Sequence, residues 1–175
     1  YPQADCRAIQ ALLKEKCRED GHKIVVLDDD PTGVQTVHDV SVYTDWSYES
    51  IKKGFEEDNK LFYILTNSRG FTVEQTTRAH LGIGENVARV SEETGIDYVI
   101  VSRGDSTLRG HYPLETELLA QAEETYRGKP VDGEIICPYF KEGGRFTIDN
   151  VHYVKYGEQL VPAGETESRS LQQSH

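Results

Sequence analysis

Residues 23–33, KIVVLDDDPTG, set a short apolar run directly before three aspartates, a proline and a glycine. A run of this length that ends abruptly in turn residues is typical of a buried parallel strand. The same arrangement recurs at residues 61–70, LFYILTNSRG, and at residues 98–110, YVIVSRGDSTLRG. Because helical segments separate the three runs, the sequence predicts a doubly wound α/β fold with an open, mainly parallel sheet.

The segments expected to be helical carry apolar residues three and four positions apart. They are residues 6–17, 47–57, 73–90 and 114–126. On the last of them the residues predicted to face the core are Leu114, Leu118, Ala122 and Tyr126. Additional strands are expected at 39–44, 134–137 and 151–156, the last in a short β-hairpin with its turn in 147–150.

A chain of 175 residues is long enough for one domain. We expect an N-terminal amphipathic helix in residues 1–22, an α/β domain in residues 23–167, and a polar tail in residues 168–175 that is disordered. The chain starts at Tyr1 and contains no methionine, which indicates a fragment or a processed chain.

The amino-acid composition argues against nucleic acid and membranes as partners of this chain. The chain has 19 Lys and Arg residues against 30 Asp and Glu residues, and its net charge of −11 argues against nucleic acid. No apolar run approaches the roughly 20 residues that a membrane-spanning helix needs, so no membrane is expected. Cys6 and Cys17 would lie about 16 Å apart on one helix, too far for a disulfide, so we expect reduced thiols and a cytoplasmic protein.

Basic residues follow the ends of the predicted strands, where ligands bind in an open α/β sheet. They are Arg69, Arg103, Arg109, Lys141 and Arg145. Guanidinium groups bind carboxylates or phosphates through two parallel hydrogen bonds, which predicts an anionic ligand. The aspartates beside them suit hydroxyl groups or a hard cation, although Asp and Gly also form ordinary turns. A polyhydroxylated acid satisfies both sets of groups, and the histidines lack metal-ligand spacing.

Four motifs in this order resemble the four-carbon acid sugar kinase family. They are DDDPTGVQTVHDV at 28–40, LTNSRGF at 65–71, RGDSTLRGHYPLET at 103–116 and CPYFKEGGRFTIDNVHYV at 137–154. The resemblance covers residues 23–167 and implies an ATP-dependent kinase that phosphorylates threonate, erythronate or an oxo-tetronate. In that family an N-terminal domain binds the sugar acid and a C-terminal domain binds the nucleotide. This chain resembles the N-terminal domain, so ATP and Mg²⁺ are expected to arrive with the missing C-terminal domain.

The resemblance also assigns site residues. It implies catalytic roles for Asp30 and Asp105, and substrate binding by Asp29, Thr32, Gly33, Arg69, Arg103, Ser106, Thr107, Arg109 and Gly110. Arg145 is added as a substrate-binding residue because it follows the predicted strand at 134–137. Arg103 stands where the family often has Lys, which keeps the charge and changes its geometry. The expected partner is a small anionic sugar acid, and homodimerisation stays open. No glycine-rich nucleotide loop is present, so the chain alone is not expected to transfer phosphate.

Two other functions fit parts of the sequence. Asp28, Asp30 and Thr32 also match the Asp-x-Asp-x-Thr motif of haloacid dehalogenase-like phosphatases. In that interpretation Asp28 is the nucleophile, Asp30 the general acid and base, and Asp105 a magnesium ligand. The second metal-binding carboxylate expected after Asp105 is replaced by TLR, which opposes it. A binding or regulatory module without chemistry is the third interpretation.

Overall fold

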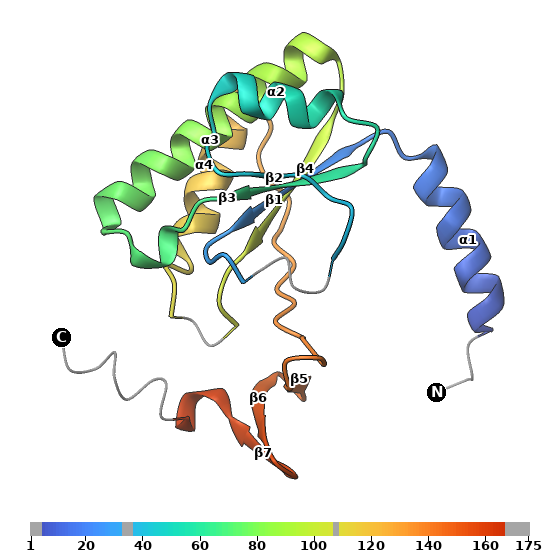
Figure 1. The fold of residues 1–175 in the computed structure, drawn as a ribbon, viewed down its shortest axis with the longest axis vertical. Helices are drawn as coiled ribbons and strands as arrows, with labels where there is room; N and C mark the ends of the chain where they lie inside the picture. The colour runs from blue at the N-terminus through green and yellow to red at the C-terminus, as the bar shows by residue number, and fades with distance from the viewer. Residues whose placement is uncertain (1–4, 33–36, 107–108, 167–175) are drawn as a thin grey trace.

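The computed structural model describes residues 5–32, 37–106 and 109–166. Figure 1 shows a main α/β unit, a helix that stands apart from it and a small antiparallel sheet. The elements in chain order are α1 (Cys6–Glu19), β1 (Lys23–Asp28), β2 (Val42–Tyr43), α2 (Tyr48–Glu56), β3 (Leu61–Leu65), η1 (Ser68–Gly70), α3 (Val73–Thr94), β4 (Tyr98–Arg103), α4 (Leu114–Arg127), β5 (Arg145–Ile148), β6 (Val151–Tyr156), β7 (Gln159–Pro162) and η2 (Ala163–Glu165). The polar tail predicted at 168–175 lies outside the described residues.

The main sheet has four parallel strands in the order β2-β3-β1-β4. Val26 at the centre of β1 lies opposite Tyr63 on β3 and Val101 on β4. The open, mainly parallel α/β sheet predicted from the three apolar runs is therefore confirmed. Because the central strands run in the same direction, the chain leaves β1, β3 and β4 at one edge of the sheet.

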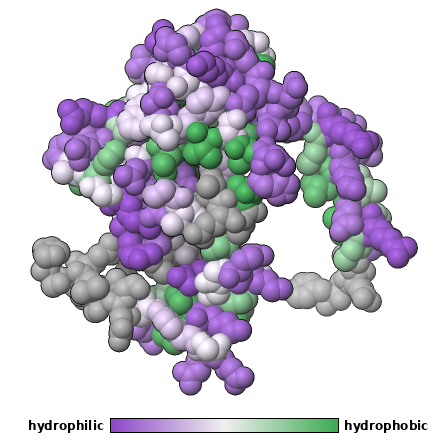
Figure 2. All heavy atoms as spheres, in the orientation of Figure 1, coloured by the Kyte–Doolittle hydropathy of each residue, from purple (hydrophilic) through white to green (hydrophobic). Residues whose placement is uncertain are grey.

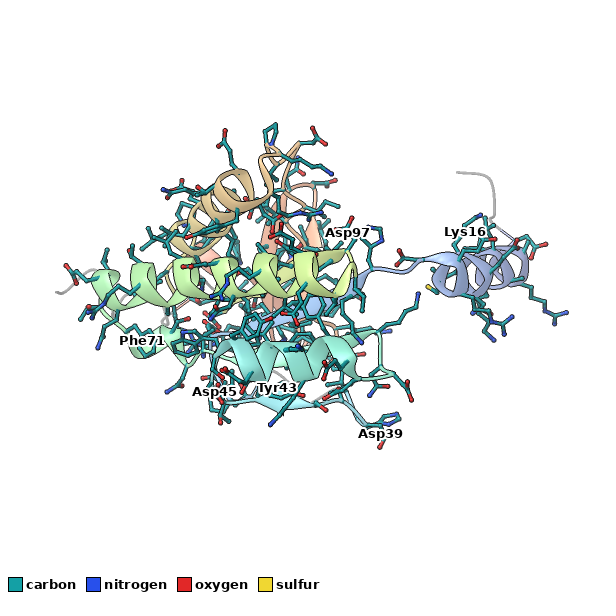
Figure 3. All side chains as sticks on the ribbon, turned by 90° about the horizontal axis from the view of Figure 1, so that it is seen from above. Lys16, Asp39, Tyr43, Asp45, Phe71 and Asp97 are labelled. Carbon is teal, nitrogen blue, oxygen red and sulfur yellow. The ribbon has the colours of Figure 1, made fainter. Side chains whose placement is uncertain are left out.

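Helices α2, α3 and α4 cover one face of this sheet and lie side by side when the molecule is seen from above (Figure 3). Apolar side chains of all three helices join those of β1, β3 and β4 in the core, which contains Val25, Leu27, Ile51, Phe55, Phe62, Ile64, Ile83, Val87, Val90, Tyr98 and Leu119. Helices α3 and α4 approach closely because Gly84 has no side chain there: a Cβ at this position would overlap Ala122. Strands β1, β3 and β4 thus rest on a closely packed layer of helices.

The small sheet has the antiparallel order β5-β6-β7. Asp149 and Asn150 join β5 to β6 with positive φ angles of 48° and 65°. Two residues with positive φ form the type I′ turn that matches the twist of a hairpin, and Asp and Asn tolerate that conformation. The predicted hairpin is confirmed, and β7 extends it by a strand that the sequence analysis did not predict.

Two predicted strands differ from the structure. The strand expected at 39–44 is reduced to Val42–Tyr43. The strand expected at 134–137 is wrong, since these residues are irregular. Ile135 is 94% exposed and Ile136 is 65% exposed. Neither burial nor a ladder of hydrogen bonds stabilises an extended conformation here, so the β-branched composition alone does not produce a strand.

Helix α1 is capped at its N-terminus by Asp5, whose carboxylate accepts hydrogen bonds from the backbone amides of Arg7 and Ala8. No residue of α1 is buried, and Figure 2 shows apolar and charged residues side by side along it, at the right of the view. The three cysteines, all within the described residues, are exposed and form no disulfide. None of the described helices has the length and apolar character needed to cross a membrane.

Candidate functional site

The site lies at the edge where β1, β3 and β4 end. Asp28 at the end of β1 is paired in register with Leu65 on β3 and with Arg103 on β4. The segments that follow these three strands therefore start at the same level of the sheet. They carry the Asp and Arg residues that the sequence analysis selected.

Arg69 connects two of these segments. Its Nε lies 3.1 Å from Asp29 Oδ2, and its Nη2 lies 2.9 Å from Asp29 Oδ1. Nη1 donates a third hydrogen bond to Asp30 Oδ2, also at 2.9 Å. The Asp29 side chain is 3% exposed, and the backbone amide of Arg69 donates to the Asp29 carbonyl oxygen. A buried carboxylate bound by two parallel N–H groups is the strong form of this interaction, so Arg69 is fixed in place.

Asp28 forms a second ion pair, with its Oδ1 3.2 Å from Arg103 Nη1. The Asp28 side chain is only 2% exposed, and burial raises its pKa, while the neighbouring Arg103 guanidinium offsets part of that rise. A phosphatase nucleophile must reach the phosphorus atom of its substrate. The enclosed carboxylate of Asp28 lacks that access, which opposes the phosphatase interpretation.

Asp105 and Arg109 form the third pair, after β4. Arg109 Nε donates to Asp105 Oδ2 at 2.9 Å, and Nη2 donates to Oδ1 at 2.8 Å. These hydrogen bonds raise the pKa of Arg109, and the charges of Asp30 and Asp29 act in the same direction. The Arg109 side chain is 45% exposed, more than those of Arg69 and Arg103. Of the three guanidinium groups, it is the one most open to a ligand.

Asp30 also bonds within its own turn. Its Oδ1 accepts hydrogen bonds from the Thr32 hydroxyl and, at 2.8 Å, from the Thr32 backbone amide. The hydroxyl contact and then the amide contact lower the pKa of Asp30. At neutral pH this carboxylate is therefore ionised, and it can accept a hydrogen bond from a ligand hydroxyl.

The arrangement differs from the sequence-based prediction in one respect. We expected guanidinium groups that face the ligand, whereas each of the three is already bonded to an aspartate of the site. Gly110 packs closely against one of these pairs, because a Cβ added to it would lie 2.9 Å from Asp29 Oδ2. Ser106 lies next to Asp105 and is partly exposed. The predicted binding residues Gly33 and Thr107 lie outside the described residues.

A family model described as a sugar-binding N-terminal domain matches residues 24–173 of this chain. The chain belongs to this family. The domain is that of four-carbon acid sugar kinases, so the family resemblance stated from the four motifs is confirmed. No curated protein and no solved structure matches the chain significantly.

Arg145 of the sugar-binding domain is not brought into the cluster. It lies on β5, and its Nη1 donates to the Gly143 carbonyl oxygen at 2.7 Å. Among the described residues it makes no hydrogen bond to the aspartates of the site. The small sheet still lies within electrostatic range of the site: burial and then Arg145 lower the pKa of His152, and the Asp105 carboxylate opposes that shift.

One buried polar group beside the arginine-bearing segments was not predicted from the sequence. Glu115 in the first turn of α4 is 4% exposed, and Ser68 and His80 around it are also buried. The helix face predicted from Leu114, Leu118, Ala122 and Tyr126 is rotated in the structure, where Glu115, Leu118, Leu119 and Ala122 are the buried residues. The spacing of Glu115 from Leu118, Leu119 and Ala122 was the signal: a charged residue stands on a helical core face.

Among the described residues, no three His, Cys, Asp or Glu side chains converge in a way that could hold a metal ion. The carboxylates at the strand ends instead face guanidinium groups. Their chemistry is that of hydrogen-bonded ion pairs that can orient a polar, charged ligand.

Proposed function

We propose that this sugar-binding domain holds a four-carbon sugar acid, such as threonate, erythronate or an oxo-tetronate, for phosphorylation by an ATP-dependent kinase. The observation that carries the proposal is the alternation of Asp and Arg side chains at the shared edge of β1, β3 and β4. Carboxylates accept hydrogen bonds from hydroxyl groups, and guanidinium groups bind a carboxylate. A sugar acid presents both kinds of group within a few bonds.

Arg109 is the proposed partner of the substrate carboxylate. The Arg109 guanidinium already binds a carboxylate, that of Asp105, through Nε and Nη2. The substrate carboxylate has the same shape and charge, so it can take the place of Asp105 at this exposed guanidinium. The exchange removes the Arg109 guanidinium from the Asp105 carboxylate, which still accepts a hydrogen bond from the Arg109 backbone amide and can then accept another from a substrate hydroxyl. Binding of the acid is thereby coupled to positioning of the hydroxyl.

Asp30 and Asp105 are the proposed catalytic residues. Asp30 is held in the ionised form by Thr32, and it orients a hydroxyl group as a hydrogen-bond acceptor. Asp105, once its contact with the Arg109 guanidinium is exchanged, is the proposed acceptor of the proton from the hydroxyl that attacks the phosphoryl donor. Asp29 and Arg69 are bonded to each other and keep the surrounding turn fixed.

The residues of this site do not suit the binding of a nucleoside triphosphate such as ATP. Four carboxylates, those of Asp28, Asp29, Asp30 and Asp105, face three guanidinium groups, those of Arg69, Arg103 and Arg109. A cluster with this excess of negative charge repels a second, highly charged anion. We therefore propose that ATP and Mg²⁺ bind to a separate nucleotide-binding domain, and that this chain supplies substrate binding and the proton acceptor.

The kinase activity is tested with a full-length protein that contains this domain. The protein is incubated with ATP, Mg²⁺ and each four-carbon sugar acid, and sugar-acid phosphate is measured. We expect a phosphorylated product from at least one of these acids, and its loss in the Asp105→Asn variant. This chain by itself, given the same mixture, is expected to yield no product. Absence of phosphorylation of every tetronate by the full-length protein contradicts the proposal.

A further inference from the structure

Glu115 is a buried carboxylate that the proposed mechanism does not use. It belongs to the first turn of α4, and its partners are Ser68 and His80 rather than the arginines. Its Oε1 accepts a hydrogen bond of 2.6 Å from the Ser68 hydroxyl. The same oxygen lies 3.6 Å from Nε2 of His80, whose Nδ1 bonds to the Thr76 carbonyl oxygen at 2.9 Å. A single carboxylate therefore touches both η1 and α3.

Ser68 is the first residue of η1, and Arg69 follows it directly. The other end of η1 is held from the same side, because His111 Nε2 lies 2.9 Å from the carbonyl oxygen of Phe71. In Figure 3, Phe71 lies at the end of the molecule where α3 begins. Two side chains at or just before the start of α4, those of His111 and Glu115, thus hold the short helix that carries Arg69 at both of its ends.

The η1 segment follows a residue in the left-handed region: Asn67, which joins β3 to η1, has a φ angle of 54°. Asparagine adopts this conformation more readily than other residues with a side chain, so Asn67 suits the turn into η1. Contacts of Ser68 and Phe71 then fix the short helix after this turn. The Ser68–Glu115 hydrogen bond is buried and ends on a carboxylate, so it is stronger than a hydrogen bond between neutral groups.

Glu115 also lies beside the second arginine-bearing segment. Its Oε2 and Asp29 Oδ2 are each 3.9 Å from the position that a Cβ on Gly104 would take. For Gly110 the corresponding distances are 3.9 Å to Glu115 Oε2 and 2.9 Å to Asp29 Oδ2. The two glycines that flank the segment with Asp105 and Arg109 therefore pack against Glu115.

We propose that Glu115 is a positioning residue of the sugar-acid site: through Ser68 it fixes η1 and thereby holds the Arg69 guanidinium against Asp29 and Asp30. The inference rests on the proposed function for its effect on binding. Its effect on Arg69 does not depend on the identity of the ligand. If Glu115 served only the packing of α4, removal of its hydrogen bond with the Ser68 hydroxyl would leave Arg69 unchanged.

The test compares Glu115→Ala and Glu115→Gln with Glu117→Gln, a matched control on an exposed position of the same helix. Two quantities are measured on this chain: the dissociation constant for erythronate and threonate by calorimetry, and the Arg69 Nε–H signal by NMR. We expect Glu115→Ala to weaken binding about tenfold, the effect of one hydrogen bond to a charged group. The same variant should shift or broaden the Arg69 signal.

Glu115→Gln keeps an oxygen that accepts from Ser68, so it should recover most of the affinity and the Arg69 signal. Glu117→Gln should match the unmodified chain. If Glu115→Ala fails to fold, Ser68→Ala removes the same hydrogen bond and is expected to shift the Arg69 signal. An unchanged Arg69 signal in a folded Glu115→Ala or Ser68→Ala variant overturns the inference. Absence of sugar-acid binding by the unmodified chain contradicts the proposed function instead, and the NMR comparison still decides the role of Glu115.

Discussion

Replacement of Arg69 by methionine leaves the Asp29 carboxylate, 3% exposed, without the two N–H groups that bind it. Removing one partner of a buried ion pair costs about 3–5 kcal/mol, since the remaining charge is buried without compensation. The Arg69 side chain is 26% exposed, so water can reach part of the gap, and we expect the lower end of that range. For a domain of this size, a loss of about 3 kcal/mol lowers Tm by about 6–12 °C.

Urea unfolding at pH 7, followed by circular dichroism, measures this loss directly. The double variant Arg69→Met with Asp29→Asn removes the uncompensated charge, so it should be clearly more stable than Arg69→Met alone. Arg78→Met changes an exposed arginine of α3 and should stay within about 0.5 kcal/mol of the unmodified chain. A loss below about 1 kcal/mol in Arg69→Met, or no recovery in the double variant, would refute the reasoning that the pair is buried and coupled.

Three other predictions concern single residues of the site. Gly110→Ala should weaken sugar-acid binding several-fold, because its Cβ would lie 2.9 Å from Asp29 Oδ2, whereas Gly104→Ala, with its nearest atoms at 3.9 Å, should bind normally in calorimetry. The chain should show no magnesium-dependent hydrolysis of an aryl phosphate, and Asp28→Asn should keep sugar-acid binding better than Asp30→Asn. Turnover that disappears in Asp28→Asn would support the phosphatase instead. The lowered pKa of Asp30 stabilises the fold above the ordinary Asp pKa of 3.8, and this contribution is lost as the pH falls through the depressed value. The free energy of unfolding, measured in urea, should therefore fall less on acidification in Thr32→Ala than in the unmodified chain. Identical pH profiles of the two proteins would contradict this prediction.

The sequence predicted the part of the fold that depends on local pattern. Each central strand was recognisable from an apolar run that ends in turn residues, and β1 was placed to within one residue of its observed end. The clustering of Arg69, Arg103 and Arg109 followed from the direction of the strands, since the carboxyl ends of parallel strands share one edge. Neither inference required knowledge of side-chain orientation.

The contacts within the site depend on that orientation and were not predictable. The charged residues near the strand ends were identified from the sequence, but which Asp pairs with which Arg was not. The binding of the Arg109 guanidinium by Asp105 was therefore not predicted. The strand predicted at 134–137 is absent because β propensity acts only where a neighbouring strand or a buried face stabilises it. Arg145 was assigned to the same edge on the basis of that strand, and it lies instead in the small sheet.

Glu115 shows why a helix face is hard to place from the sequence. Leu118 and Ala122 were assigned to the core correctly, but Leu114 and Tyr126 extended the face in the wrong direction, and Tyr126 is 46% exposed. A rotation by one residue brings Glu115 into the interior, where a charge is expected only with a partner. Its partner, Ser68, is distant in the sequence and becomes adjacent only in the folded chain.

Calorimetric titration of this chain with erythronate and with erythritol tests the central claim most directly. The two molecules have the same carbon skeleton and differ in the carboxylate that Arg109 is proposed to bind. We predict measurable binding of the acid that weakens as salt is added, with no detectable binding of the polyol. Equal binding of the two molecules, or no binding of any four-carbon sugar acid, would contradict the account.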